Sequence, residues 1–296
     1  MAMFVNENEE CGQQHISNTF PFVIKSISTP HIGQMIFDLL DRNTLAKSRR
    51  VCKAWRDFVD SKTNLWGFVS KERYMQAAKQ GKVPIVRLIL NKVSNKNPRS
   101  DWMGRTPLHG AASQGHLEIC QLIMAQVANR NPSTDVGNTP LHAAALNGYL
   151  EICRLIIDRV QVKNPACNGG QTPLHWAAMK GHVEVCRLIM ANISNKNPAS
   201  KNGTTPLHRA AAEGHLEVCR MIMEKIDDKN LGDKHGDTPL HVAAENGHQE
   251  VCQLIINAIG YKNPANVEGV TPLQVAVQRG HSEIYQLLKN EGPVSF

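Results

Sequence analysis

The sequence predicts an all-α helical solenoid that is preceded by a small, separate helical module. A motif recurs six times at one fixed interval within residues 71–296, whereas the apolar residues between positions 30 and 66 follow no repeat. The chain of 296 residues has only four Trp, four Tyr and seven Phe, so its core must consist mainly of aliphatic, Ala and Met side chains. Such side chains suit closely packed helices, and the chain is long enough for two domains.

The repeated motif is Thr-Pro-Leu-His, which occurs five times and then once more as Thr-Pro-Leu-Gln, each copy starting 33 residues after the last. The starting residues are Thr106, Thr139, Thr172, Thr205, Thr238 and Thr271. The common continuation is x-Ala-Ala-x-x-Gly-His-x-Glu-[Ile/Val]-Cys-x-[Leu/Met]-Ile. One such unit cannot bury its apolar face alone, so neighbouring copies must stack into a continuous core.

The residues of the motif indicate a pair of helices behind a tight turn. Gly104, two residues before the first Thr, suits a turn that needs positive φ. Thr106 is a suitable N-cap and Pro107 fits the first turn of a helix, which Gly115 would end. A second helix is expected to begin near His116. Its expected core residues are Ile119, Cys120, Leu122 and Ile123.

This motif resembles the ankyrin repeat, whose period is the same. The resemblance implies a helix-turn-helix unit with a hairpin loop in every 33 residues, and an array that binds other proteins through its concave face. Met75 to Pro98 resembles a degenerate copy, because Ala77-Ala78 precedes the next Ala pair by 34 residues. Residues 71–296 are therefore predicted to hold one degenerate capping repeat and six 33-residue repeats.

The net charge of +7 lies mainly in the array, where 25 Lys and Arg face 19 Asp and Glu. Each repeat has one cation just after its second helix, namely Lys96, Arg130, Lys163, Lys196, Lys229 and Lys262. Cations at a helix C-terminus complement the helix dipole, and a nucleic-acid surface would need denser cations and interleaved aromatics. We call these six residues the basic column. It is predicted to be structural, with no nucleic-acid partner. The apolar residue three positions before each cation is expected to extend the second helix.

Cysteine and histidine follow the same period. Five Cys lie 33 residues apart at one helical position, where a buried thiol behaves as a small hydrophobic group. Packed helices lie about 8–10 Å apart, which exceeds the reach of a disulfide. Ten of the 13 His occupy the Thr-Pro-Leu-His or Gly-His positions, where local hydrogen bonding is expected. The sequence thus predicts no catalytic residue, no metal and no cofactor, and the chain is not expected to be an enzyme.

Positions that differ from copy to copy are the expected recognition surface, because stacking does not dictate them. The predicted substrate-binding residues are Trp102, Met103, Arg105, Leu146, Trp176, Met179, Lys180, Arg209, Glu213 and Val242. Trp176 and Arg209 are of the types that dominate interface energetics. Replacing both with Ala is expected to weaken partner capture and leave thermal stability nearly unchanged. The alternative is that Trp102 covers the first repeat junction and Trp176 fills a groove between helices.

Residues 27–70 form the predicted helical module, after an irregular tail of residues 1–26. Leu40-Asp-Arg-Asn-Thr-Leu45, Arg50-Val-Cys-Lys-Ala-Trp55-Arg56 and Asn64-Leu-Trp66 resemble the F-box, although the usual Leu-Pro-x-Glu opening is Thr29-Pro30-His31-Ile32 here. The resemblance implies binding to the adaptor subunit of a cullin-RING ubiquitin ligase. The matching residues are Pro30, Ile36, Phe37, Leu40, Leu45, Val51, Trp55 and Trp66. A plain helical cap on the array is the alternative.

Together the two resemblances imply a protein-binding adaptor, as the substrate-recognition subunit of a cullin-RING ligase with an unknown protein substrate. The alternative is a plain ankyrin scaffold or sequestering protein. No stretch approaches the roughly 18 consecutive apolar residues of a membrane span, and the first residues lack a basic segment followed by an apolar one. The expected location is intracellular, cytoplasmic and/or nuclear, with no membrane partner.

Overall fold

The computed structural model describes residues 71–261 and 263–289. Lys71–Leu90 and the described residues from Ser94 onward belong to one compact unit. The described residues form seven helix pairs and no β-strand, which confirms the predicted all-α solenoid. The first helices are α5 (Lys71–Lys79), α7 (Pro107–Ser113), α9 (Pro140–Leu146), α11 (Pro173–Met179), α13 (Pro206–Ala212), α15 (Pro239–Glu245) and α17 (Pro272–Arg279). The second helices are α6 (Val83–Lys92), α8 (Leu117–Met124), α10 (Leu150–Ile157), α12 (Val183–Ala191), α14 (Leu216–Met223), α16 (Gln249–Ile259) and α18 (Ser282–Lys289).

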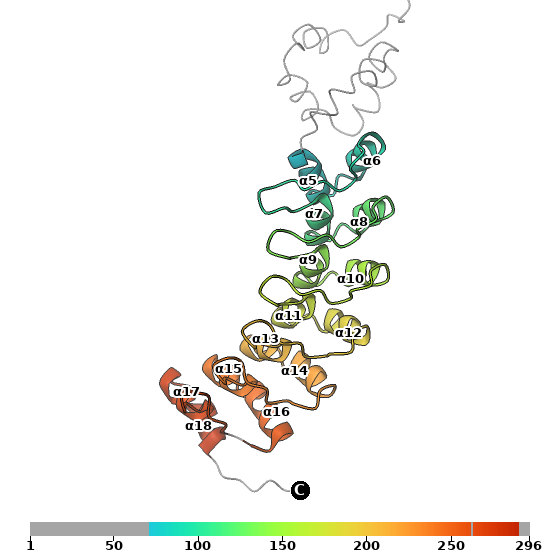
Figure 1. Cartoon of the computed structure of the whole chain (residues 1–296). Coiled ribbons are helices and arrows are strands. Elements are labelled where there is room, and N and C mark those ends of the chain that lie inside the picture. Colours follow the sequence, from blue (N-terminus) through green and yellow to red (C-terminus); the bar gives the residue numbers. More distant parts are fainter. Residues whose placement is uncertain (1–70, 262, 290–296) are drawn as a thin grey trace, which may run out of the picture. The chain divides into compact units, whose positions relative to one another are not determined.

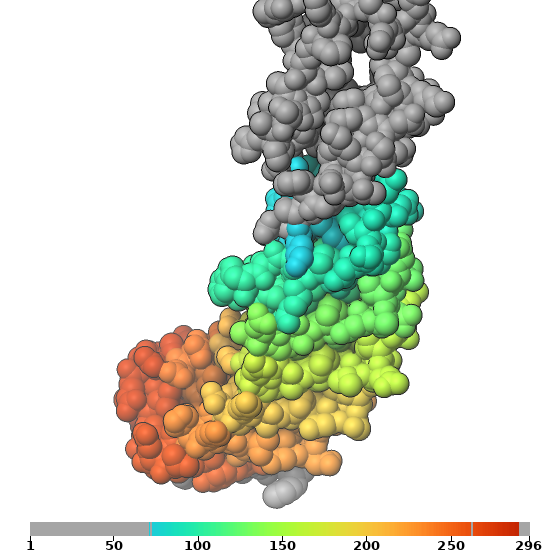
Figure 2. Space-filling model, turned by 45° about the horizontal axis from the view of Figure 1, so that its top comes forward, coloured from blue at the N-terminus to red at the C-terminus, as the bar shows by residue number. Residues whose placement is uncertain are grey.

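The pairs stack in order along the array. Each first helix packs on the next first helix, and from α8 onward each second helix packs on the next second helix, so that two columns of helices run side by side (Figure 1). Each first helix from α7 onward also packs on the second helix of its own pair. In the space-filling view the repeats form successive colour bands (Figure 2). A repeat therefore has its neighbouring repeats as its main packing partners, as expected of a solenoid.

Each first helix of a full repeat starts as predicted. Thr106 is the N-cap of α7, Pro107 lies in its first turn, and His109 completes a capping box with the Thr106 side chain and backbone. The helix ends before Gly115, whose φ of 77° only glycine adopts readily. Gly104, in the turn before the helix, has a φ of 73°. The same starting motif therefore produces the same short helix in each copy.

The core lies between the two columns. The Leu of each Thr-Pro-Leu-His motif is fully buried, and so are the Ala pairs that let neighbouring first helices approach. In α8 the buried residues are Ile119, Cys120, Ile123 and Met124. The expectation for Leu122 is wrong, because it is only half-buried and Met124 takes its place in the core. The five repeat cysteines are buried, and burial raises the pKa of the Cys120 thiol to about 12, so it is an uncharged packing group.

The predicted extension of the second helices is wrong for most repeats. α8 ends at Met124, three residues before Val127, and α14 ends at Met223, three residues before Ile226. Only in α16, among the described second helices, does the helix include the apolar residue, Ile259, and there Gly260 closes it with a φ of 68°. Elsewhere the chain leaves the helix earlier, and the apolar residue lies half-buried in the loop.

The basic column explains why these helices can end early. Lys163 Nζ donates to the carbonyl oxygen of Ile157, the last residue of α10, and Lys196 Nζ donates to that of Met190 in α12. Arg130 Nε donates to the carbonyl oxygen of Met124 at 3.3 Å. These bonds satisfy carbonyl groups that have no partner within the helix. The predicted structural role of the column is thus confirmed for these residues, while Lys262 lies outside the described residues.

Candidate protein-binding face

The ten predicted substrate-binding residues all belong to the first helices, to their C-caps or to the loops that lead into them. Three lie in the loop before α7, three follow the His of a first helix, and four lie at the C-terminal end of a first helix. We call these positions the variable face. They are, in that order, Trp102, Met103 and Arg105; Trp176, Arg209 and Val242; and Leu146, Met179, Lys180 and Glu213.

Neighbouring loops of the variable face are linked by one backbone hydrogen bond each. Asp135 N donates to Met103 O at 3.0 Å, and Asn168 N donates to Val136 O at 2.9 Å. The same bond recurs along the array as far as Val267 N, which donates to His235 O at 2.9 Å. The loops therefore form a regular column beside the first helices, and their tips keep a fixed spacing.

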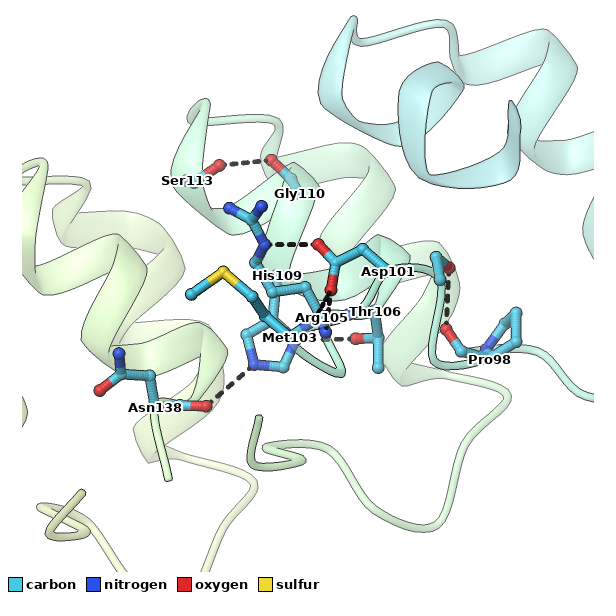
Figure 3. Close-up of polar contacts among 10 residues, drawn as sticks. Pro98, Asp101, Met103, Arg105, Thr106, His109, Gly110, Ser113 and Asn138 are labelled. Atoms are coloured by element: carbon cyan, nitrogen blue, oxygen red, sulfur yellow. Dashed lines mark hydrogen bonds and ion pairs between the residues drawn. The ribbon is translucent and has the colours of Figure 1, made fainter. Parts of the chain in front are cut away.

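The first loop presents an exposed aromatic residue beside a paired cation. Trp102 is 86% exposed, so it does not cover a junction within the described repeats. Arg105 Nε pairs with Asp101 Oδ2 at 2.6 Å, and Asp101 Oδ1 accepts hydrogen bonds from the backbone N–H groups of Met103 and Arg105 (Figure 3). Asp101 thus closes the loop and already neutralises Arg105. Trp102 is the most accessible large apolar group of the face.

Trp176 has contacts within the fold as well as an exposed part. Its Nε1 donates to Gln171 Oε1 at 3.1 Å, and its ring meets the His142 ring of the preceding repeat edge-on, with centroids 5.2 Å apart. Ala143 occupies the equivalent position of that repeat. Trp176 therefore packs partly within the fold, as the alternative interpretation of the sequence expected. Replacing Trp176 with Ala removes both of these contacts. We therefore expect this change to lower thermal stability, whereas the sequence suggested that stability would stay nearly unchanged.

The remaining residues of the variable face differ in accessibility. Lys180 and Glu213 are exposed at the ends of α11 and α13. Leu146, Met179 and Val242 are half-buried between repeats. Arg209 is also half-buried, and its Nε atom is buried with no hydrogen-bond partner. Gln171, which holds Trp176, was not among the predicted site residues, although its variable position just before Thr172 was the signal that could have found it.

The histidines of the repeats make bonds between repeats and not only local ones. His109 Nδ1 accepts from Thr106 N at 3.1 Å, and its Nε2 donates to the carbonyl oxygen of Asn138 in the next repeat at 3.1 Å (Figure 3). We call the equivalent residues the histidine ladder. Its members are His109, His142, His175, His208 and His241.

Burial keeps four of the five ladder histidines neutral. Desolvation lowers the pKa of His109, His142 and His175 to about 4, and it also lowers that of His208. A neutral ring can accept at Nδ1 and donate at Nε2, which is the pattern that these bonds require. In all five ladder residues both ring nitrogens are occupied by bonds within the fold, so the ladder is a structural element and offers no free nitrogen to a metal.

A second column of histidines links each full repeat to the one before it, except in the second full repeat, where Tyr149 takes the place of the histidine. His182 Nε2 donates to Leu146 O at 3.1 Å, and His215 Nε2 donates to Met179 O at 3.0 Å. Each ring also lies against the glycine that ends the preceding first helix, since a Cβ on Gly181 would be 2.6 Å from His215 Nδ1. These contacts fix the ends of the first helices, and with them the positions of Leu146 and Met179 on the variable face.

Outside the variable face lies a pocket of about 550 Å³, between residues 94–99 and 126–133. Its polar groups serve the fold, because Asn97 Oδ1 accepts from Leu108 N at 3.0 Å and Lys96 Nζ bonds Leu90 O. No predicted site residue lines it. Among residues 71–261 and 263–289, no three His, Cys, Asp or Glu side chains are grouped to hold a metal ion. No helix of that range is long and apolar enough to cross a membrane.

Comparison with known families accounts for both parts of the chain. A family model of ankyrin repeats in three copies matches residues 74–166, 159–233 and 225–294. An F-box-like model matches residues 30–71, a range that includes all eight residues expected to bind a ligase adaptor and that lies, except for Lys71, outside the described residues. No curated protein matches the chain. Both domains are interaction modules, so the chain is a protein-interaction adaptor. It belongs to the ankyrin-repeat proteins and has an F-box-like domain before its repeats.

Proposed function

We propose that the chain is the substrate-recognition subunit of a cullin-RING ubiquitin ligase of the F-box type. The observation that carries the proposal is the order of domains, with an F-box-like segment at residues 30–71 followed at once by a protein-binding array. F-box domains typically bind the adaptor subunit of such ligases, and the variable face would hold the substrate. Ubiquitin transfer would be performed by partner subunits, in the cytoplasm and/or nucleus, so this chain itself needs no catalytic group.

The proposal assigns a role to each segment. Residues 1–26 are a tail, residues 27–70 bind the ligase adaptor, and residues 71–296 bind the substrate. Within residues 27–70 the apolar side chains of the first helix, among them Ile36, Phe37 and Leu40, are the proposed adaptor contacts. Trp55 and Trp66 would support them from the module's own core, since large aromatic residues in a domain of this size are needed for its packing.

Affinity purification of the tagged full chain from cells tests the proposal. The intact chain should recover the ligase adaptor and a cullin, and deletion of residues 27–70 should abolish both. The double variant Ile36→Asp and Leu40→Asp should reduce their recovery at least tenfold, because a charge in an apolar interface is strongly unfavourable. Arg220→Gln is the control, because it changes an exposed side chain of α14 and should leave the recovery of both proteins unchanged.

The same experiment separates the ligase role from simple binding. Proteins that depend on the variable face should become less ubiquitinated, and more abundant, when residues 27–70 are deleted. A chain that recovers such partners without any cullin, and whose partners keep their ubiquitination after the deletion, would be a scaffold or sequestering protein. That result would refute the ligase proposal and leave the binding face in place.

A further inference from the structure

Three buried side-chain polar atoms of the described residues have no hydrogen-bond partner: Asn138 Oδ1, Arg209 Nε and Asn230 Oδ1. Such atoms are rare in folded proteins because each destabilises the folded state. An Asn amide can exchange its donor and acceptor ends by turning about one bond. A guanidinium carries only donors, so exchanging its ends cannot give Arg209 Nε the acceptor that it lacks. Its Nε needs an acceptor that the described part of this chain does not provide.

Arg209 also differs from the other arginines of the described residues. Seven of them form ion pairs, at Arg87, Arg99, Arg105, Arg154, Arg187, Arg220 and Arg279. Arg130 and Arg159 donate to backbone carbonyl oxygens, and Arg73 also has an interaction. Within residues 71–261 and 263–289, Arg209 is the arginine whose side chain forms no hydrogen bond or ion pair. It is also half-buried, whereas the arginines in ion pairs are exposed.

The position of Arg209 puts this unpaired cation in the middle of the variable face. It lies in α13 directly after His208, at the site that Trp176 occupies in the repeat before and Val242 in the repeat after. His208 Nε2 is already bonded to Asp237 O at 2.9 Å, so it competes for no ligand. The guanidinium is therefore flanked along the array by the half-buried indole of Trp176 on one side and an aliphatic group on the other.

The surrounding charges favour a ligand with a single negative charge. Asp233 and Asp237 are close enough to act on the same His208 as Arg209, but neither forms an ion pair with Arg209. Lys180 and Glu213, at the ends of α11 and α13, carry opposite charges. A phosphate, with close to two negative charges, would be repelled by these carboxylates and would need further cations. A carboxylate needs only one guanidinium, which can bind it through two parallel N–H donors.

We propose that Arg209 is the anchor for an Asp or Glu side chain of the partner, with an apolar partner side chain lying against Trp176. The substrate class is thus an acidic segment that carries an apolar residue close to the acid. This inference deepens the proposed function. It rests on the assignment of partner binding to the variable face and is independent of the ligase role.

Selection of random peptides displayed on phage, with the full chain as target, tests the anchor. Peptides selected by the wild-type chain should share an acidic position, and replacing that residue by its amide should weaken binding about 10- to 100-fold, as expected for a charged hydrogen bond. Arg209→Met should cause a similar loss, and the two changes together should add little more. Arg209→Glu should select basic peptides instead. Arg220→Met, in the same repeat and paired with Glu217, should bind like the wild type.

A stability measurement guards against a purely structural role. Arg209→Met keeps an apolar stem and removes the unpaired donor, so its thermal midpoint should equal or exceed that of the wild type. The inference is overturned if no acidic position is enriched, if the amide peptides bind the wild type equally well, or if Arg209→Met lowers the thermal midpoint while peptide affinity is unchanged. Cullin recovery by Arg209→Met reports separately on the ligase role, because it should match the wild type.

Discussion

The histidine ladder and the variable face lie on the same short helices, yet they differ in whether their buried polar groups have hydrogen-bond partners. His208 and Arg209 are consecutive residues of α13. Both nitrogens of His208 are bonded, one to Thr205 of its own repeat and one to the carbonyl oxygen of Asp237 in the next. Arg209 is left with a buried, unbonded Nε. The ladder position serves stacking, whereas the variable position next to it leaves a donor without a partner, and the proposed anchor rests on this difference.

Acidification should produce the largest effect on the ladder. His109, His142 and His175 have a pKa of about 4 in the folded chain, below the usual 6.5, so the unfolded chain binds protons first as the pH falls. Their contribution to stability is therefore complete above pH 6.5 and is lost as the pH falls towards 4. At pH 5 the loss should be roughly 2 kcal/mol per residue, and urea unfolding at pH 8, 6 and 5 measures it. A free energy of unfolding that is constant over this range would contradict the buried, neutral ladder.

The last repeat supplies the control for this experiment. Gln274 replaces the ladder His there, and its Oε1 accepts from Thr271 N at 2.9 Å without titrating. His142→Gln should therefore keep the capping box and reduce the pH dependence between pH 8 and 5. It should also lower stability at pH 8, because the shorter amide loses the bond to Gln171 O in the next repeat.

Two glycines with positive φ, one inside the array and one in its last repeat, differ in whether a histidine packs against them. Gly181 has a φ of 70° and faces the ring of His215, which is held by its bond to Met179 O. Gly181→Ala should lower the free energy of unfolding by about 3 kcal/mol, from backbone strain and from the clash. Gly280 has a φ of 75° but nothing within 4 Å, so Gly280→Ala should lower it by only about 1 kcal/mol. Equal losses in urea unfolding would mean that contact with the histidine contributes nothing.

The smallest expected effect comes from two equivalent asparagines. Asn197 Oδ1 accepts from Leu207 N at 3.1 Å and thereby satisfies one of the first N–H groups of α13. Asn197→Ala should lower the free energy of unfolding by about 1 kcal/mol. Asn230 occupies the same position in the repeat where Leu231 replaces Pro, and its Oδ1 has no partner. Asn230→Ala should change stability by less than about 0.5 kcal/mol. A reversed order in urea unfolding would show that Asn230 has the stronger bond.

Sequence periodicity predicted most of the fold, because each element of the repeat depends on local chemistry. Thr106 caps a helix and Gly104 turns the chain for reasons that lie within a few residues of each. The ends of the second helices were not predictable in this way. At α8 and α10 the helix ends with a bond from Arg130 or Lys163 back to a free carbonyl group, which is a matter of three-dimensional reach rather than of hydrophobic pattern.

The positions of the variable face follow from the sequence alone, because a position that changes among otherwise regular copies is not required for stacking, and their role in binding stays a prediction. The contacts of the individual residues on this face could not be predicted from the sequence. The sequence placed Trp176 and Arg209 together as equal candidates, but only the tertiary structure decided that Trp176 is braced by Gln171 and His142 while Arg209 has no partner. A local pattern fixes which residues are free to vary. Whether a variable side chain already has hydrogen-bond partners depends partly on neighbours from other repeats, which only stacking brings into contact. The bonds of the two histidine columns, for example, join residues that lie 29 to 37 positions apart in the chain.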